Sequence, residues 1–341
     1  MDFSKNKKLM LWGSVTAVLL FILILSLCFL FKPFVGSESR FVCIDFDDNV
    51  DSVYVKLDEA GATGMPLFRI MAFAGHYSEK IHPGRYQVGE GQNVFSVFRR
   101  LRGRMQTPVK FVVPIVNTTD NLAAKLGKLL CKDSTEWAAV FHDSLFLAQY
   151  DVDTATLPAL FIPNTYEVYW TVEPKTLLDM MKKANDAYWT QHRRQQAEKA
   201  GLTPVEVVTL ASIVEKESSK NDEKPRIAGM YLNRLHKDMN LSADPTVKFA
   251  LRNFGLRRIL FEHLKVESPY NTYKHKGLPP GPICIPSLAS IEAVLNFEKN
   301  DYLFMCARED FSGYHNFAVT AAEHMANARR YSQALDARKI K

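Results

Sequence analysis

The sequence predicts an α+β protein that begins with a single membrane-spanning helix. An uncharged apolar segment lies near the N-terminus, and short stretches with strand character alternate with longer stretches of helical periodicity. The chain has 341 residues, of which 47% are hydrophobic and 23% are charged, so it can form one to three packed domains. It has no Gly, Pro or Ser excess, no heptads and no internal repeat, which argues against collagen, coiled coils and solenoids.

The apolar segment at residues 9–31 is the expected membrane anchor. At about 1.5 Å per residue it is long enough to cross a hydrocarbon core of about 30 Å. Lys5, Lys7 and Lys8 precede it, so the positive-inside rule assigns residues 1–8 to the cytoplasm and the rest to the outer side of the membrane. The alternative is a cleaved signal peptide, but its apolar region would span only about 7–15 residues and end at a small-x-small site. We therefore expect an uncleaved single-pass anchor.

Composition and motifs exclude several classes of function. The net charge of +6 suits an anionic partner, yet no Lys/Arg block interleaves with aromatic residues, so we do not expect nucleic-acid binding. The five cysteines lack CxxC or CxxH spacing, and we expect neither a metal nor a cofactor; the exported ones are either disulfide-bonded or buried thiols. No Gly-x-Ser-x-Gly or HExxH motif is present, and the one Ser-x-x-Lys match begins at Ser4, in the predicted cytoplasmic tail.

The first exported region, residues 41–113, has the pattern of a small α+β unit. Apolar and β-branched residues predict strands, and the spacing of Val94, Val97, Phe98 and Leu101 predicts a helix. The expected elements are strands over residues 41–46, 52–57 and 85–88 and a helix over residues 93–102. An apolar strand over residues 108–115 is expected to open the next region.

A second strong signal is the helix that follows Gly201. Thr203-Pro204-Val205-Glu206 is a capping box with Pro at the first helical position. Val207, Leu210, Ala211 and Val214 form one apolar stripe, and Glu217 continues its edge at the C-terminal end of the helix.

Glu217 therefore has the sequence context of a general acid. Burial and the negative end of the helix dipole would both raise its pKa. A structural Glu paired with Lys216, Lys220 or Arg226 is the alternative. Glu215 projects about 160° away from Glu217, so the two cannot form a side-by-side acid pair, and Glu215 is expected to be solvated.

Five ordered blocks of the sequence resemble the YceG-like family of MltG-type endolytic murein transglycosylases. The first block, Ala211 to Ser218, resembles the catalytic helix of the family, and the single anchor, Gly84-x-Tyr86 and Ile162-Pro163-Asn164-Thr165-Tyr166 add to the match. The other four blocks are Tyr231-Leu232-Asn233-Arg234-Leu235, Met239 to Val247, Ser268-Pro269-Tyr270-Asn271-Thr272-Tyr273 and Gly277-Leu278-Pro279-Pro280-Gly281-Pro282-Ile283. The chain departs from the family at Asn164, where Asp is usual, at Cys284, where a small residue is usual, and at His315-Asn316-Phe317, which only approximates the His-x-Phe segment of the family.

The resemblance implies an architecture and a reaction. It implies a tail at residues 1–8, an anchor at 9–31, a LysM-like subdomain at 32–110 and a mixed α/β catalytic domain at 111–341, outside the bacterial inner membrane. The reaction is lytic cleavage of the bond between N-acetylmuramic acid and N-acetylglucosamine in nascent peptidoglycan strands, which leaves 1,6-anhydro ends and terminates elongation. Penicillin-binding proteins or other elongation and division machinery are the implied partners.

The resemblance assigns catalysis to Glu217, the second Glu of the Glu-Lys-Glu triplet. One carboxyl group would act first as acid and then as base, and no metal or nucleotide is needed. Asn271 and Tyr273 are candidates to hydrogen-bond the sugars, Tyr270 is a candidate stacking face, and Glu215 could at most line the far wall of the cleft.

Two rival functions stay open at this point. A muramidase-type hydrolase would need a second carboxylate about 5–9.5 Å from Glu217, with Asp222, Asp238 and Asp244 as candidates. A non-catalytic glycan-binding scaffold of the division machinery would not depend on Glu217. Product mass separates the first rival from a lytic enzyme, because hydrolysis adds a water.

Overall fold

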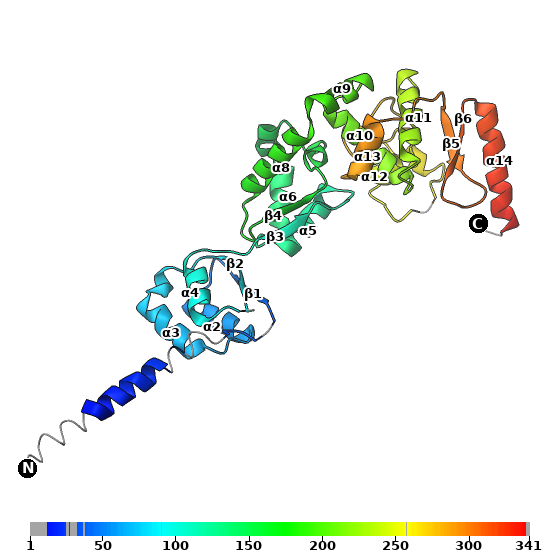
Figure 1. Ribbon diagram of the computed structural model, residues 1–341. Helices are drawn as coiled ribbons and strands as arrows, with labels where there is room; N and C mark the ends of the chain where they lie inside the picture. Colours follow the sequence, from blue (N-terminus) through cyan, green and yellow to red (C-terminus); the bar gives the residue numbers. More distant parts are fainter. Residues whose placement is uncertain are drawn as a thin grey trace, which may run out of the picture. The chain divides into compact units, whose positions relative to one another are not determined.

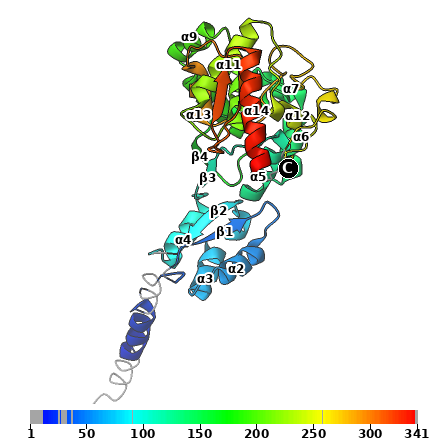
Figure 2. The same cartoon turned by 90° about the vertical axis from the view of Figure 1, so that its right-hand side faces the viewer.

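The computed structural model describes residues 12–24, 27, 33–36, 38–89, 91–256 and 258–338. Helices and strands both contribute, as the sequence predicts, and the strands form three small two-stranded sheets. The chain divides into two compact units (Figures 1 and 2). One unit comprises Met1–Lys110 and Glu167–Val172, and the other comprises Phe111–Tyr166 and Glu173–Lys341.

The predicted anchor is only partly covered by the described residues. Residues 12–24 are helical and exposed, whereas residues 9–11, 25–26 and 28–31 and the predicted tail at 1–8 lie outside the described residues. No helix in the part of the chain that the structure describes combines the length and the apolarity of a membrane span.

The first unit is built on an antiparallel pair of strands, β1 (Arg40–Ile44) and β2 (Gly84–Val88), with Val42 opposite Tyr86. Alternate residues of both strands are buried, as expected for a sheet with one covered face. The helices of this unit are α2 (Val50–Glu59), α3 (Met65–Ala74) and α4 (Val94–Arg102). The predicted strands at 41–46 and 85–88 and the predicted helix at 93–102 are confirmed, while the LysM-like assignment stays a prediction.

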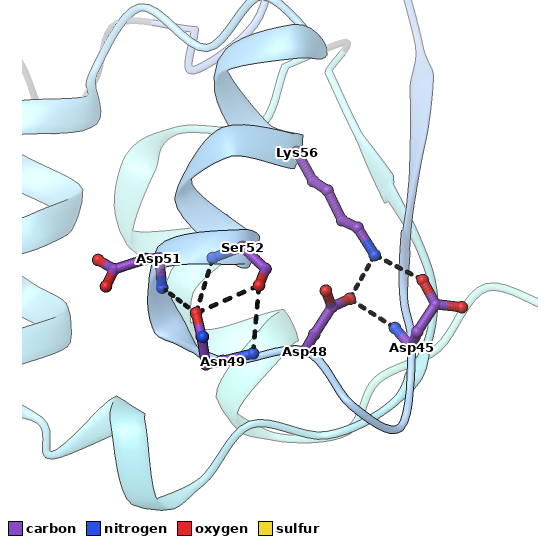
Figure 3. A network of polar contacts seen from close by, with 6 residues as sticks. All are labelled: Asp45, Asp48, Asn49, Asp51, Ser52 and Lys56. Atoms are coloured by element: carbon purple, nitrogen blue, oxygen red, sulfur yellow. Dashed lines mark hydrogen bonds and ion pairs between the residues drawn. The ribbon is translucent and has the colours of Figure 1, made fainter.

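The strand predicted at residues 52–57 is wrong, because these residues lie in α2. Asn49 forms a capping box with Ser52, in which Asn49 Oδ1 accepts the N–H of Ser52 at 3.0 Å (Figure 3). Val53 and Leu57 then fall on one buried face of a helix, so the apolar residues that suggested a strand also satisfy helical periodicity. Lys56 adds a tie to the loop before the helix, since its Nζ lies 2.5 Å from Asp45 Oδ2 and also pairs with Asp48.

The second unit is mainly helical. Its helices are α5 (Thr119–Leu129), α6 (Ser134–His142), α7 (Ser144–Leu147), α8 (Pro174–Tyr188), α9 (Gln191–Lys199), α10 (Pro204–Glu217), α11 (Lys224–His236), α12 (Asp244–Ala250), α13 (Leu288–Leu295) and α14 (Ala321–Ala337). Its antiparallel hairpin consists of β5 (Phe304–Ala307) and β6 (His315–Ala318). A further pair is formed by β3 (Val109–Val112), within the strand predicted at 108–115, and β4 (Thr165–Val168).

Helix α10 is the centre of the second unit. The predicted capping box is confirmed, since Thr203 and Glu206 cap each other and Pro204 occupies the first position. The predicted apolar stripe is too narrow: every residue from Val207 to Val214 is buried, including Thr209 and Ser212. The hydroxyl of Ser212 satisfies its hydrogen-bonding capacity by donating to Thr209 O and accepting the N–H of Ile283 at 2.9 Å. A helix buried on all sides gives its C-terminal residue a fixed position.

The β5–β6 hairpin lies between α11 and α14 (Figure 1). Arg234 of α11 fastens it by donating from Nε to Leu303 O at 2.6 Å. The loop before α12 is held in the same way, because Arg234 Nη1 donates to Leu241 O at 2.7 Å. One side chain therefore fixes two walls of the space beyond the end of α10.

Candidate active site

Glu217 is the last residue of α10, as the sequence predicts. Ser218 adopts an extended conformation and ends the helix, so the Glu217 side chain leaves the packed core at the helix terminus. It opens into a cavity of about 270 Å³, whose wall is formed by residues of α10, α11, α12, the loop before α12, the segment after residue 270 and the hairpin. The lining residues are Glu217, Met230, Tyr231, Arg234, Leu241, Ser242, Asp244, Tyr273, Met305, Cys306, Ala307 and His315.

The pKa of Glu217 lies above its ordinary value. Burial is the main cause, because loss of water disfavours the charged carboxylate, and the negative charge of Asp244 acts in the same direction. The hydrogen bond from Tyr231 and the charges of His315 and Lys248 oppose this rise without cancelling it. A carboxyl group that keeps a proton at higher pH is suited to act as a general acid.

Tyr231 holds the Glu217 carboxyl in place. Its hydroxyl donates to Glu217 Oε1 at 2.8 Å, and the ring is almost completely buried in the core of α10 and α11. The other oxygen, Oε2, has no hydrogen-bond partner among the described residues and belongs to a side chain that lines the cavity. The hydrogen bond from Tyr231 thus orients the carboxyl group through Oε1 and leaves Oε2 available to a molecule in the cavity. The sequence placed Tyr231 in a family motif but gave it no role. Helical periodicity could have predicted its position on α11.

Glu215 has a different role from the one expected. It is not solvated, and it is not among the residues that line the cavity. Its Oε2 lies 3.1 Å from Lys224 Nζ and accepts hydrogen bonds from the hydroxyls of Ser287 and Ser290. Burial tends to raise its pKa, but these donors and the Lys224 charge outweigh that effect and lower it. Glu215 ties α10 to α11 and to the start of α13.

Asn271 and Tyr270 also lie outside the cavity wall. Asn271 is fully buried, and its amide donates to Leu264 O at 2.8 Å and to Val266 O at 2.9 Å. Tyr270 packs on Phe249 with ring centroids 4.5 Å apart, next to the core. Both residues organise the loop that carries Tyr273, while the sugar-binding amide at Asn271 and the stacking face at Tyr270 stay predictions.

Tyr273 does reach the cavity, where it meets Asp244. Its hydroxyl donates to Asp244 Oδ1 at 2.6 Å, and burial together with this bond raises the Tyr273 pKa. Asp244 begins α12 and is the one of the three candidate second carboxylates that lines the cavity. Asp222 accepts the hydroxyl of Tyr314 at 3.0 Å, and Asp238 pairs with Lys276.

A buried acid and an imidazole form a third polar group at the cavity. Glu223 is 4% exposed, and its Oε2 lies 2.8 Å from His315 Nδ1 while its Oε1 accepts the N–H of His315 at 2.7 Å. Ser218, next to Glu217, donates to the same carboxylate at 3.2 Å. This contact fixes His315, which lines the cavity from β6, relative to the end of α10. Sequence reasoning missed Glu223, because its partner is distant in the chain.

The cysteines and possible metal ligands were the remaining candidates for chemistry. Cys43, Cys284 and Cys306 are free thiols. Cys284 is buried, as the thiol alternative predicts, whereas Cys43 and Cys306 are only partly buried. Burial raises the pKa of Cys284 to about 12. Within residues 12–24, 27, 33–36, 38–89, 91–256 and 258–338, no three His, Cys, Asp or Glu side chains gather as metal ligands would.

Comparison with known proteins gives the family. The profile of the YceG-like family matches residues 42–330, which is most of the chain. The chain belongs to the YceG-like family.

Two similar proteins from different bacteria carry the same name. A Bacillus subtilis (strain 168) protein named endolytic murein transglycosylase is 33% identical over 269 residues, covering 73% of this YceG-like chain and 72% of the relative. A Streptococcus pneumoniae (serotype 2, strain D39) protein of the same name is 28% identical over 308 residues, covering 81% of this chain and 56% of the relative. The chain thus spans little more than half the length of that relative. A crystal structure of a yceG-like protein from Listeria monocytogenes is 28% identical, with a TM-score of 0.54, and covers 85% of this chain and 99% of that one.

Proposed function

We propose that this YceG-like protein is an endolytic peptidoglycan lytic transglycosylase with Glu217 as its acid and base. The observation that carries the proposal is the Glu217 carboxyl at the end of a buried helix, with a raised pKa, facing a cavity large enough for a sugar ring. The names of the relatives from Bacillus subtilis and Streptococcus pneumoniae support the same reaction.

The reaction uses the one carboxyl group twice. Protonated Glu217 gives its proton to the oxygen of the bond between N-acetylmuramic acid and N-acetylglucosamine, and that bond breaks. The resulting carboxylate then takes the proton of the muramyl 6-hydroxyl, whose oxygen closes the 1,6-anhydro ring at C1. Tyr231 keeps Oε1 occupied, so both transfers pass through Oε2. The masses of the two fragments add up to that of the substrate, because no water is added.

The cellular part of the proposal follows from the N-terminal segment. We infer a single-pass anchor at residues 9–31 in the inner membrane, with residues 1–8 in the cytoplasm, a LysM-like subdomain at 32–110 and the catalytic domain at 111–341 outside. An enzyme held at the membrane meets strands near the synthase, which fits termination of elongation beside penicillin-binding proteins or other elongation and division machinery.

A muramidase-type hydrolase is the second candidate, favoured by Asp244 in the Glu217 cavity. The test is mass spectrometry of muropeptides released from purified peptidoglycan by the full-length protein in detergent, with Glu217→Gln and the exposed Glu198→Gln as a matched pair of variants. We expect anhydro-muramyl products from the native protein and from Glu198→Gln, and none from Glu217→Gln. Reducing-end products would establish the hydrolase, and unchanged cleavage by Glu217→Gln would refute the proposal.

A further inference from the structure

Helix α3 of the first unit exposes a continuous apolar stripe. The side chain of Phe73 is 87% exposed and that of Ile70 is 65% exposed, and Pro66 lies exposed one turn before Ile70. These residues are spaced i, i+4 and i+7, so they share one side of the helix. The stripe lies opposite the buried face of α3, which contains Phe68 and Ala72. Contiguous exposed apolar surface is typical of a site that contacts a membrane or another molecule.

Helix α4 packs beside α3 and extends the same outer surface (Figures 1 and 2). A Cβ added to Gly64, just before α3, would meet Val94 at the start of α4. A Cβ added to Gly75, just after α3, would meet Phe98 in the second turn of α4. The two helices therefore start side by side and run in broadly the same direction.

The outer side of α4 has the same spacing as that of α3 but carries positive charge. Phe95, Arg99 and Arg102 are exposed at positions i, i+4 and i+7. Neither guanidinium group has an ion-pair partner among the described residues. The two stripes thus place apolar side chains next to unpaired cations. Helices that lie in the interface of an anionic membrane have this combination of apolar and basic side chains.

The same surface begins where the chain would leave the bilayer. The proposed anchor ends at residue 31, and Pro33 already forms a β-bridge with Asn93, the cap residue of α4. Phe34 is fully buried, and its carbonyl accepts the N–H of Thr63 at 2.8 Å, two residues before α3 begins. The starts of both helices are therefore fastened to the first residues after the anchor, which brings this surface within reach of the lipid headgroups.

We propose that the outer side of α3 and α4 docks on the membrane, with apolar side chains inserted between the lipids and arginines at the phosphates of anionic headgroups. This docking face consists of Pro66, Ile70, Phe73, Phe95, Arg99 and Arg102. The inference rests on the proposed anchor and adds a second, peripheral membrane contact to it. A glycan suits this face less well, because the α3 stripe has no polar side chain to meet sugar hydroxyls. Docking would give the first unit a fixed orientation at the bilayer surface.

Photocrosslinking in vesicles tests this contact directly. The full-length protein with Phe73→p-benzoylphenylalanine is reconstituted into vesicles of phosphatidylethanolamine and phosphatidylglycerol and irradiated. The matched variant is Phe46→p-benzoylphenylalanine, because Phe46 is also exposed but follows β1 at the end of the sheet away from Phe34. Mass spectrometry should detect a lipid adduct at residue 73 and at least tenfold less adduct at residue 46.

The charge of the docking face predicts a lipid preference. One basic side chain near an anionic surface changes a binding equilibrium about fivefold. Replacing phosphatidylglycerol by phosphatidylcholine should therefore lower the adduct yield at residue 73 at least fivefold. Arg99→Gln with Arg102→Gln in the same chain should remove most of this preference. Lys110→Gln is the charge control, because it alters an exposed cation on β3, and it should keep the preference.

Vesicle flotation separates a failure of this inference from a failure of the anchor. A protein that floats with the vesicles but gives no lipid adduct at residue 73, or equal adducts at residues 73 and 46, would overturn the docking while the anchor stood. With purified peptidoglycan strands added, a glycan adduct or a crosslinked dimer at residue 73 in place of the lipid adduct would also overturn it. A protein that alkaline carbonate releases from the vesicles would refute the anchor on which the inference rests.

Discussion

The buried ion pair of Glu215 and Lys224 makes a quantitative prediction about the scaffold that holds Glu217. The Lys224 side chain is 3% exposed and that of Glu215 is 14% exposed, so neither charge has much access to water. In the Glu215→Gln variant the amide keeps the shape of the side chain and can still accept from Ser287 and Ser290, but the Lys224 ammonium loses its counter-charge. Breaking a buried pair in this way costs about 3–5 kcal/mol.

Because the serine contacts are retained, we expect the free energy of local opening to fall by about 3 kcal/mol, at the lower end of this range. This corresponds to about a 100-fold change in the opening equilibrium. Native-state hydrogen exchange of peptides from α10 and α13 measures that opening locally, without requiring both units to unfold together. We expect about 100-fold faster exchange there in Glu215→Gln, and no change in Glu198→Gln, which alters an exposed charge on α9.

The sign of the pH dependence is fixed by the lowered pKa of Glu215. A carboxyl with a lower pKa in the folded state stabilises the protein above its unfolded pKa, and this contribution is lost as the pH falls through the folded pKa. Native α10 should therefore lose protection on acidification, while Glu215→Gln should lack that part of the loss. Adding Lys224→Met to Glu215→Gln should recover much of the protection. Exchange in Glu215→Gln within about twofold of the native rate at neutral pH would refute the reasoning.

Three further predictions concern other parts of the molecule. Tyr231→Phe removes the hydrogen bond that lowers the pKa of Glu217, so the alkaline limb of the activity profile should move to higher pH; a shift to lower pH would contradict this assignment. Gly281→Ala should destabilise the second unit by about 1–3 kcal/mol in urea denaturation, because an added Cβ would lie 2.2 Å from Ala155 O. Gly255→Ala should be close to neutral, because a Cβ there would meet Asn253 Oδ1 at an ordinary contact distance of 3.7 Å. Lys56→Met should lower the stability of the first unit by about 1 kcal/mol through loss of its contacts with Asp45 and Asp48 (Figure 3), and an unchanged denaturation midpoint would show that these contacts contribute nothing.

The features that could be predicted from the sequence are those set by neighbouring residues. The start of α10 follows from Thr203 and Glu206, which cap each other three residues apart. Helical periodicity then places Glu217 at the terminus, and Asp244 at the start of α12 follows from the Pro that succeeds it. The same local reasoning failed for residues 52–57, where Val and Tyr favour a strand but the Asn49 cap begins a helix.

The features that could not be predicted depend on contacts between distant segments. Glu215 meets Ser287 and Ser290 more than 70 residues later in the chain, and no local pattern distinguishes such a glutamate from a solvated one. Asn271 is directed to Leu264 and Val266 by the path of its loop, which removes it from the cavity. His315 reaches Glu223 only because the hairpin packs beside α11.

The central claim is that the bond is cut by one carboxyl group without water. Digestion of purified peptidoglycan strands by the full-length protein in H₂¹⁸O, followed by mass spectrometry of the new chain ends, tests this most directly. The account predicts 1,6-anhydro ends that carry no ¹⁸O and disappear with Glu217→Gln. New ends that contain one ¹⁸O atom would show that water is the acceptor and would contradict it.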